Sequence, residues 1–82
     1  MKIFYTRKAI SSFQKLPMDI QKRIAKKMRF YASQEDPLEF AKRLVNPDEG
    51  EFRFRIGDYR IFFDIINKSI FVLKISHRGK AY

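Results

Sequence analysis

The sequence predicts an α+β fold in which two helices pack on one face of a single sheet that contains a three-stranded antiparallel meander. Apolar residues lie three or four positions apart up to residue 31, which is helical spacing, and at every second position after residue 51, which is strand spacing. The 82 residues leave room for one hydrophobic core, and a composition of 45% hydrophobic residues is sufficient to form it. We therefore expect residues 1–82 to form one domain.

The N-terminal half predicts a strand followed by a helical hairpin. Residues 2–6 are rich in aromatic and β-branched side chains, and Thr6 is placed to cap the next helix. That helix should end near Pro17, and its apolar side consists of Ala9, Ile10, Phe13 and Leu16. A second helix should open at Pro17, with an apolar stripe of Ile20, Ile24, Met28 and Tyr31. The two helices are expected to share one apolar face.

The middle of the chain predicts a short helix and a turn. Asp36 is a good helix cap and Pro37 suits the first helical turn, so we expect a helical segment through about Leu44. Residues 46–50 (Asn-Pro-Asp-Glu-Gly) are the strongest turn signal in the sequence.

The C-terminal part predicts a three-stranded antiparallel meander that completes the sheet. With Gly57-Asp58 as a two-residue turn, Ile56 lies opposite Tyr59, and one face of this hairpin is entirely apolar. A two-residue loop at 67–68 would turn Lys74 and Ser76 toward the core. We therefore expect a three-residue loop, 67–69, which places Phe71, Leu73 and Ile75 in the core.

The other face of the meander should collect cations. Arg55 lies opposite Arg60 and Arg53 lies opposite Phe62, and like charges directly opposed on a sheet are destabilising unless an anion lies between them. Lys74 points toward Arg60, and the residues after the last strand should lie near the same rim: His77, Arg78 and Tyr82. In an alternative interpretation, the carboxylates of Glu51, Asp58 and Asp64 neutralise the cluster.

Composition restricts the class of partner. The net charge of +9 favours an anionic partner, namely nucleic acid, an anionic membrane or an acidic protein, although it is also compatible with a merely soluble basic surface. The absence of cysteine and the single histidine argue against disulfides and against thiolate or multi-histidine metal sites, so no metal or cofactor is predicted. No apolar run approaches the length of a membrane span, and Met1-Lys2-Ile3 opens no signal peptide. We expect a soluble, cytoplasmic protein with no membrane partner.

The predicted cation cluster suits phosphodiester chemistry. Arginine binds phosphate through two donors and stays charged, so it can stabilise a pentacovalent transition state but cannot act as a base. Histidine ordinarily titrates near neutrality, which makes His77 the candidate for proton transfer unless it only caps the strand end. Tyr82 could orient the phosphate, donate a proton or stack on a base, or be a frayed terminus. Phe62 could stack on a base or pack against its neighbours.

The segment 52–63 (Phe-Arg-Phe-Arg-Ile-Gly-Asp-Tyr-Arg-Ile-Phe-Phe), together with Ile75-Ser76-His77-Arg78 and Tyr82, resembles the RelE/ParE toxin superfamily. The resemblance extends over nearly the whole chain. It implies a toxin of a type II toxin–antitoxin system, held inactive by a cognate antitoxin that we expect to be acidic. In the RelE branch, which the chain resembles, such a toxin cuts messenger RNA in the ribosomal A site, so the ribosome and messenger RNA are the other implied partners.

The resemblance also implies roles for individual residues. Arg60 matches the arginine that stabilises the scissile phosphate, and Arg53 and Arg55 occupy basic strand positions of the active site. Lys74 is expected to bind phosphate beside them because of its place in the strand register, not because of the resemblance. Arg78 and Tyr82 match a C-terminal arginine and tyrosine, and His77 lies where some members use histidine. Some members have lysines where this strand has Arg53, so the task of general base would fall on His77.

The implied reaction is attack of a ribose 2′-OH on the adjacent phosphate, without metal, giving a 2′,3′-cyclic phosphate and a free 5′-OH. The alternatives are a ParE-like inhibitor of DNA gyrase that cuts nothing, and an inactive RNA-binding module. His77, Arg78 and Tyr82 together favour the nuclease.

Overall fold

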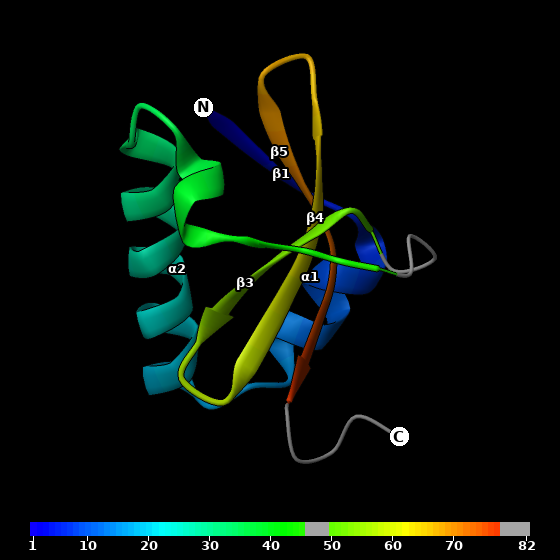
Figure 1. Cartoon of the computed structure of the whole chain (residues 1–82). Coiled ribbons are helices and arrows are strands. Elements are labelled where there is room, and N and C mark those ends of the chain that lie inside the picture. The colour runs from blue at the N-terminus through cyan, green and yellow to red at the C-terminus, as the bar shows by residue number, and fades with distance from the viewer. Residues whose placement is uncertain (46–49, 78–82) are drawn as a thin grey trace.

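A computed structural model of the chain describes residues 1–45 and 50–77. Its elements are β1 (Lys2–Tyr5), α1 (Arg7–Gln14), α2 (Met18–Ser33), the 3₁₀ helix η1 (Pro37–Phe40), β2 (Lys42–Arg43), β3 (Phe52–Ile56), β4 (Tyr59–Ile66) and β5 (Ser69–His77). Within these residues, the strands form one mixed sheet in the order β1-β5-β4-β3-β2, in which only β1 and β5 are parallel. Residues of α1 and α2 pack into one core against the same face of the sheet (Figure 1), so the predicted α+β fold is confirmed.

The predicted caps and stripes account for both helices. The Thr6 hydroxyl accepts a hydrogen bond from the Ala9 N–H at 3.1 Å and donates one to the Leu73 carbonyl at 3.0 Å, which ties the start of α1 to β5. Ile24 and Met28 of α2 are fully buried, as their spacing predicts. Ile10 is 44% exposed, however, because it borders a hollow of about 390 Å³ between the two helices instead of the core. No helix in the described ranges is long and apolar enough to cross a membrane.

The segment after α2 differs from its prediction. The Asp36 carboxylate caps the Leu38 N–H at 3.2 Å, as expected, but the helix ends at Phe40 and does not reach Leu44. The next residues form β2, and the Leu44 N–H donates to the Glu51 carbonyl at 2.8 Å. Pairing with β3 therefore outweighs the local helical preference. The predicted turn lies mainly at residues 46–49, outside the described residues.

The β3–β4 hairpin has the predicted register. Ile56 pairs with Tyr59, Phe54 with Ile61 and Phe52 with Phe63. The Phe54 ring is stacked between those of Tyr31 and Phe63, with centroids 4.3 Å from each. This aromatic stack joins α2 to the middle of the sheet and fixes which face of the hairpin is buried.

The β4–β5 connection corrects the predicted loop. Asn67 and Lys68 both have positive φ, 49° and 60°, and form a two-residue turn whose twist suits a hairpin. A bulge at Leu73 then shifts the register between Phe62 and Phe63 by one residue. Before the bulge, Val72 lies in the core and Phe71 stacks on Phe4 on the other face. Leu73 is the bulged residue. The prediction that Phe71 and Leu73 lie in the core was therefore wrong. Beyond the bulge, Ile61 pairs with Ile75 and Arg60 with Ser76, as predicted.

Candidate nucleic-acid interface

The helix-free face of the sheet carries two adjacent cross-strand rows of mainly polar side chains. The first row runs Arg55, Arg60, Ser76 across β3, β4 and β5. The second runs Lys42, Arg53, Phe62, Lys74 across β2, β3, β4 and β5. We call the five cations of these rows the basic face: Lys42, Arg53, Arg55, Arg60 and Lys74. Four of the predicted site residues therefore lie together.

Strand periodicity places these cations. Phe52, Phe54 and Ile56 are buried against the helices, and the alternation of β3 directs Arg53 and Arg55 to the other side. In β4, Arg60 lies between two residues that pack in the core and is itself partly buried. Core packing of the alternate residues therefore determines the face from which the cations project.

Phe62 forms the floor between the cations of the second row. Its side chain is only 5% exposed although it lies on the helix-free face, and the Lys74 ammonium lies 5.6 Å from the ring centroid. Packing against its neighbours is therefore the interpretation that fits, because a buried ring offers no open surface to a base.

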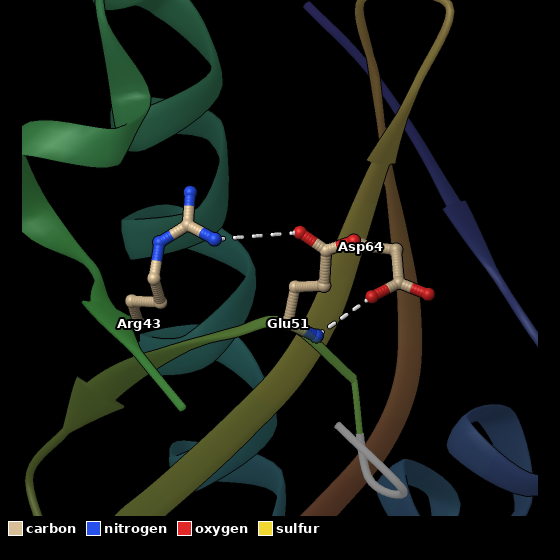
Figure 2. A network of polar contacts seen from close by, with 3 residues as sticks. All are labelled: Arg43, Glu51 and Asp64. Atoms are coloured by element: carbon tan, nitrogen blue, oxygen red, sulfur yellow. Dashed lines mark hydrogen bonds and ion pairs between the residues drawn. The ribbon is translucent and has the colours of Figure 1, made fainter. Parts of the chain in front are cut away.

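Two of the three acidic residues that could have neutralised the basic face are engaged with other groups. The Glu51 carboxylate forms an ion pair with Arg43 at 3.8 Å, and the Asp64 carboxylate accepts the Glu51 N–H at 2.8 Å (Figure 2). Asp58 lies exposed in the β3–β4 turn. Among the residues with described positions, no ion pair links a carboxylate to Arg53, Arg55 or Arg60. Within the described ranges, the carboxylates of Glu51, Asp58 and Asp64 therefore do not pair with these three arginines.

His77 occupies a position that differs from its prediction. It is the last residue of β5, not a residue beyond the strand, and it pairs with Tyr59. The two rings meet edge to face with centroids 4.9 Å apart. Since Tyr59 packs against the core, its cross-strand partner His77 lies on the helix side of the sheet, away from the basic face. The expected position on the polar face was wrong, because the strand continues one residue further than predicted. Arg78 and Tyr82 lie outside the described residues.

Lys42 is the member of the basic face that sequence reasoning missed. It follows the Asp36-Pro37 start signal and lies within the segment that was expected to be helical. Its side of the sheet follows only from the pairing of β2 with β3, which places it opposite Arg53. A two-residue strand leaves no periodic signal in a sequence.

This arrangement can bind a phosphodiester and stabilise added negative charge. Adjacent strands lie about 4.8 Å apart, so neighbouring cations of one row can reach different oxygens of the same phosphate. Arginine guanidinium groups remain charged throughout and cannot remove a proton. The basic face therefore supplies binding and electrostatic stabilisation, and proton transfer needs another group.

The chain matches a known protein family over nearly its whole length. The family model described as "ParE toxin of type II toxin-antitoxin system, parDE" matches residues 3–82. The comparison with curated proteins found no match.

The fold is similar to solved structures of toxin–antitoxin complexes. A chain of the RelBE2 complex from Mycobacterium tuberculosis is 28% identical, with a TM-score of 0.81 over 94% of this chain and 96% of the other. A chain of the archaeal RelE–RelB complex from Pyrococcus horikoshii is 24% identical, with a TM-score of 0.75 over 98% and 97%. A chain of the intact E. coli RelBE complex is 19% identical, with a TM-score of 0.71 over 93% and 94%.

Proposed function

The chain belongs to the ParE toxin family of type II toxin–antitoxin systems, and we propose that this toxin is a ribosome-dependent endonuclease of messenger RNA that acts in the cytoplasm. The observation that carries the proposal is the basic face, in which Arg55 opposes Arg60 with no carboxylate bound to either among the described residues. Such an arrangement is stabilised when a phosphate lies between the two guanidinium groups.

In the proposed reaction the ribose 2′-oxygen attacks the adjacent phosphorus and the bond from phosphorus to the 5′-oxygen breaks. The 2′-OH gives up its proton to a base as it attacks, and the leaving 5′-oxygen takes up a proton. The products are a 2′,3′-cyclic phosphate and a 5′-hydroxyl. Arg60 and Arg55 stabilise the charge on the non-bridging oxygens, while Arg53 and Lys74 hold the strand. Arg78 and Tyr82 are proposed, from the family resemblance alone, as a further cation and a phosphate-orienting or proton-donating group. The ribosome holds the messenger RNA in place.

We retain His77 as the proposed proton-transfer group, and its position makes this prediction specific. His77 follows Ser76, the cross-strand partner of Arg60, and therefore lies next to the basic face in the chain but on the other side of the sheet. To reach a phosphate on the basic face, its imidazole must act around the end of the sheet. His77→Gln should lower single-turnover cleavage by about 10²–10⁴-fold, the usual effect of losing a general acid or base. Binding to the ribosome should persist, because it depends mainly on the many cations.

The matched variant for this prediction is Lys74→Gln, which removes the amine on the basic face itself. If His77→Gln cleaves at the parent's rate, His77 only packs against Tyr59. Proton transfer then belongs to Lys74 if cleavage is lost in Lys74→Gln and also in Lys74→Arg, because arginine keeps the positive charge but cannot give up a proton. Single-turnover rates for the three variants on programmed ribosomes decide the matter.

A second candidate function is inhibition of DNA gyrase without cleavage, which the ParE description of the matching family favours. The two functions are separated by a pair of assays on the purified toxin. Primer extension on messenger RNA in a translating extract should show new 5′ ends, and gyrase supercoiling should proceed unaffected. Gyrase inhibition without new RNA ends would establish the second function, and activity in neither assay would leave the inactive RNA-binding module.

The proposed partner in the resting cell is an acidic cognate antitoxin that covers the basic face. A net charge of +9 favours fast association with such a protein. Hydrogen exchange should therefore slow across residues 51–63 when the antitoxin binds. Unchanged exchange in this segment would show that neutralisation works through another surface.

A further inference from the structure

Arg23 of α2 reaches across to the tip of the β3–β4 hairpin. A Cβ on Gly57 would lie 3.0 Å from Nη1, 3.2 Å from Cζ and 3.2 Å from Nη2 of Arg23. Three near-equal distances show that the guanidinium lies broadside against the turn. Gly57 has a φ of 59° and no side chain, so it both forms the turn and leaves space for this contact. Figure 1 shows the turn beside the N-terminal half of α2.

This contact links the basic face to a second basic surface. Gly57 lies in the turn between Arg55 and Arg60, two residues after the first and three before the second. Arg23, which lies against Gly57, is therefore next to the turn that joins these two members of the first row. Arg23 also lines a hollow of about 400 Å³ on α2, together with Lys26, Lys27 and Phe30. On an ideal helix these four side chains fall within an arc of about 100°.

The hollow combines cations with an exposed aromatic ring. Phe30 is 47% exposed, and the Lys27 ammonium lies 5.8 Å from its ring centroid. The acidic residue of α2, Asp19, lies in its first turn, and within the described part of the chain no cation of α2 forms an ion pair. Cations that track a backbone beside an open ring on which a base can stack are the features of a single-strand binding surface.

We propose that the RNA strand continues from the basic face around the hairpin tip into this hollow, with phosphates on Arg23 and Lys26 and a base stacked on Phe30. This extended path rests on the proposed function and gives it a longer footprint than the reacting phosphate alone. Arg23 and Phe30 are seven residues apart, or about 10 Å along the helix, so only an RNA longer than a few nucleotides can occupy both surfaces.

The test uses two single-stranded RNA probes, a 12-mer and a trinucleotide, both 2′-O-methylated so that they cannot be cut. Fluorescence anisotropy should show that Arg23→Gln and Phe30→Ala each weaken binding of the 12-mer by about 5-fold or more while leaving the trinucleotide unaffected. Arg23→Gln should also reduce the salt dependence of 12-mer binding by about one counterion.

Two matched controls remove equivalent groups elsewhere. Arg29→Gln removes the same charge from the same helix, about 120° around its axis. Arg29 lies near Tyr5. Burial raises the pKa of the Tyr5 hydroxyl, and the positive charge of Arg29 partly offsets this effect. Phe4→Ala removes an equally exposed ring, 45%, at the β1 edge of the sheet. If Arg23→Gln and Phe30→Ala weaken the 12-mer no more than these controls do, the extended path is wrong.

Failure of the path and failure of the proposed function give different results. Suppose that Arg60→Ala abolishes binding of the trinucleotide, while Arg23→Gln changes the binding of neither probe. The basic face is then an RNA site, and the extended path is wrong. Absence of binding to either probe by the parent protein overturns the extended path, whereas the proposed function is overturned only if programmed ribosomes show no cleavage.

Discussion

Replacing Arg60 by alanine is expected to abolish growth inhibition while the protein stays folded. Arg60 is partly buried in the basic face, opposite Arg55, and lies outside the hydrophobic core, so its removal creates no cavity there. Loss of one group that stabilises the transition-state charge should lower the cleavage rate by about 10²–10³-fold. The melting temperature should stay the same or rise slightly, because a repulsion across the strands is relieved.

The matched control for this variant is Arg29→Ala, which removes the same charge from α2, away from the basic face. It should retain toxicity, and the two variants should be compared at equal expression. A soluble Arg60→Ala protein that remains fully toxic would remove Arg60 from the site. Equal loss of toxicity in both variants would assign the effect to net charge.

Replacing Phe54 by alanine is expected to cause the largest loss of stability. Its side chain is fully buried, and its ring is stacked between Tyr31 and Phe63. Truncation of a buried phenylalanine costs about 3–5 kcal/mol in the free energy of unfolding. For a domain of this size each kcal/mol lowers the melting temperature by about 4–8 °C, so the variant should melt more than about 12 °C below the parent.

Phe4→Ala is the control for Phe54→Ala, because that ring is 45% exposed and stacks on Phe71 outside the core. Thermal unfolding followed by circular dichroism should show a much smaller shift for it. Equal shifts in the two variants, or a parent-like Phe54→Ala, would contradict the burial of Phe54 and with it the register of the β3–β4 hairpin.

The parts of the fold that follow from local periodicity were predictable from the sequence. The caps at Thr6 and Asp36, the buried stripe of α2 and the pairing of β3 with β4 are all confirmed. β2 was missed because a two-residue strand exists only through its partner. The β4–β5 loop was wrong because the prediction assumed an unbroken alternation, whereas the bulge at Leu73 allows a tight turn and still keeps Ile75 in the core.

The candidate site was predictable to the same extent. Arg53, Arg55 and Arg60 are placed by strand alternation close to a turn that the sequence identifies. Lys74 was placed on the correct face because the missed bulge offsets the error in loop length. The face on which His77 lies depends on whether β5 ends at Ser76 or at His77, and strand ends are the least predictable feature of a sequence. Arg23 carried no signal in the sequence, because its contact with Gly57 joins elements that are far apart in the chain.

The most direct test of the central claim, that the basic face promotes attack by a ribose 2′-OH, uses a messenger RNA with one altered nucleotide. Primer extension first locates the cut on programmed ribosomes, and the 2′-OH of the nucleotide on the 5′ side of that cut is then replaced by hydrogen. We expect the all-ribose message to yield a 2′,3′-cyclic phosphate and a 5′-OH, and the deoxy-substituted message to stay intact at that position. Cleavage of the substituted message at the parent's rate, or no cleavage of either message, would contradict the account.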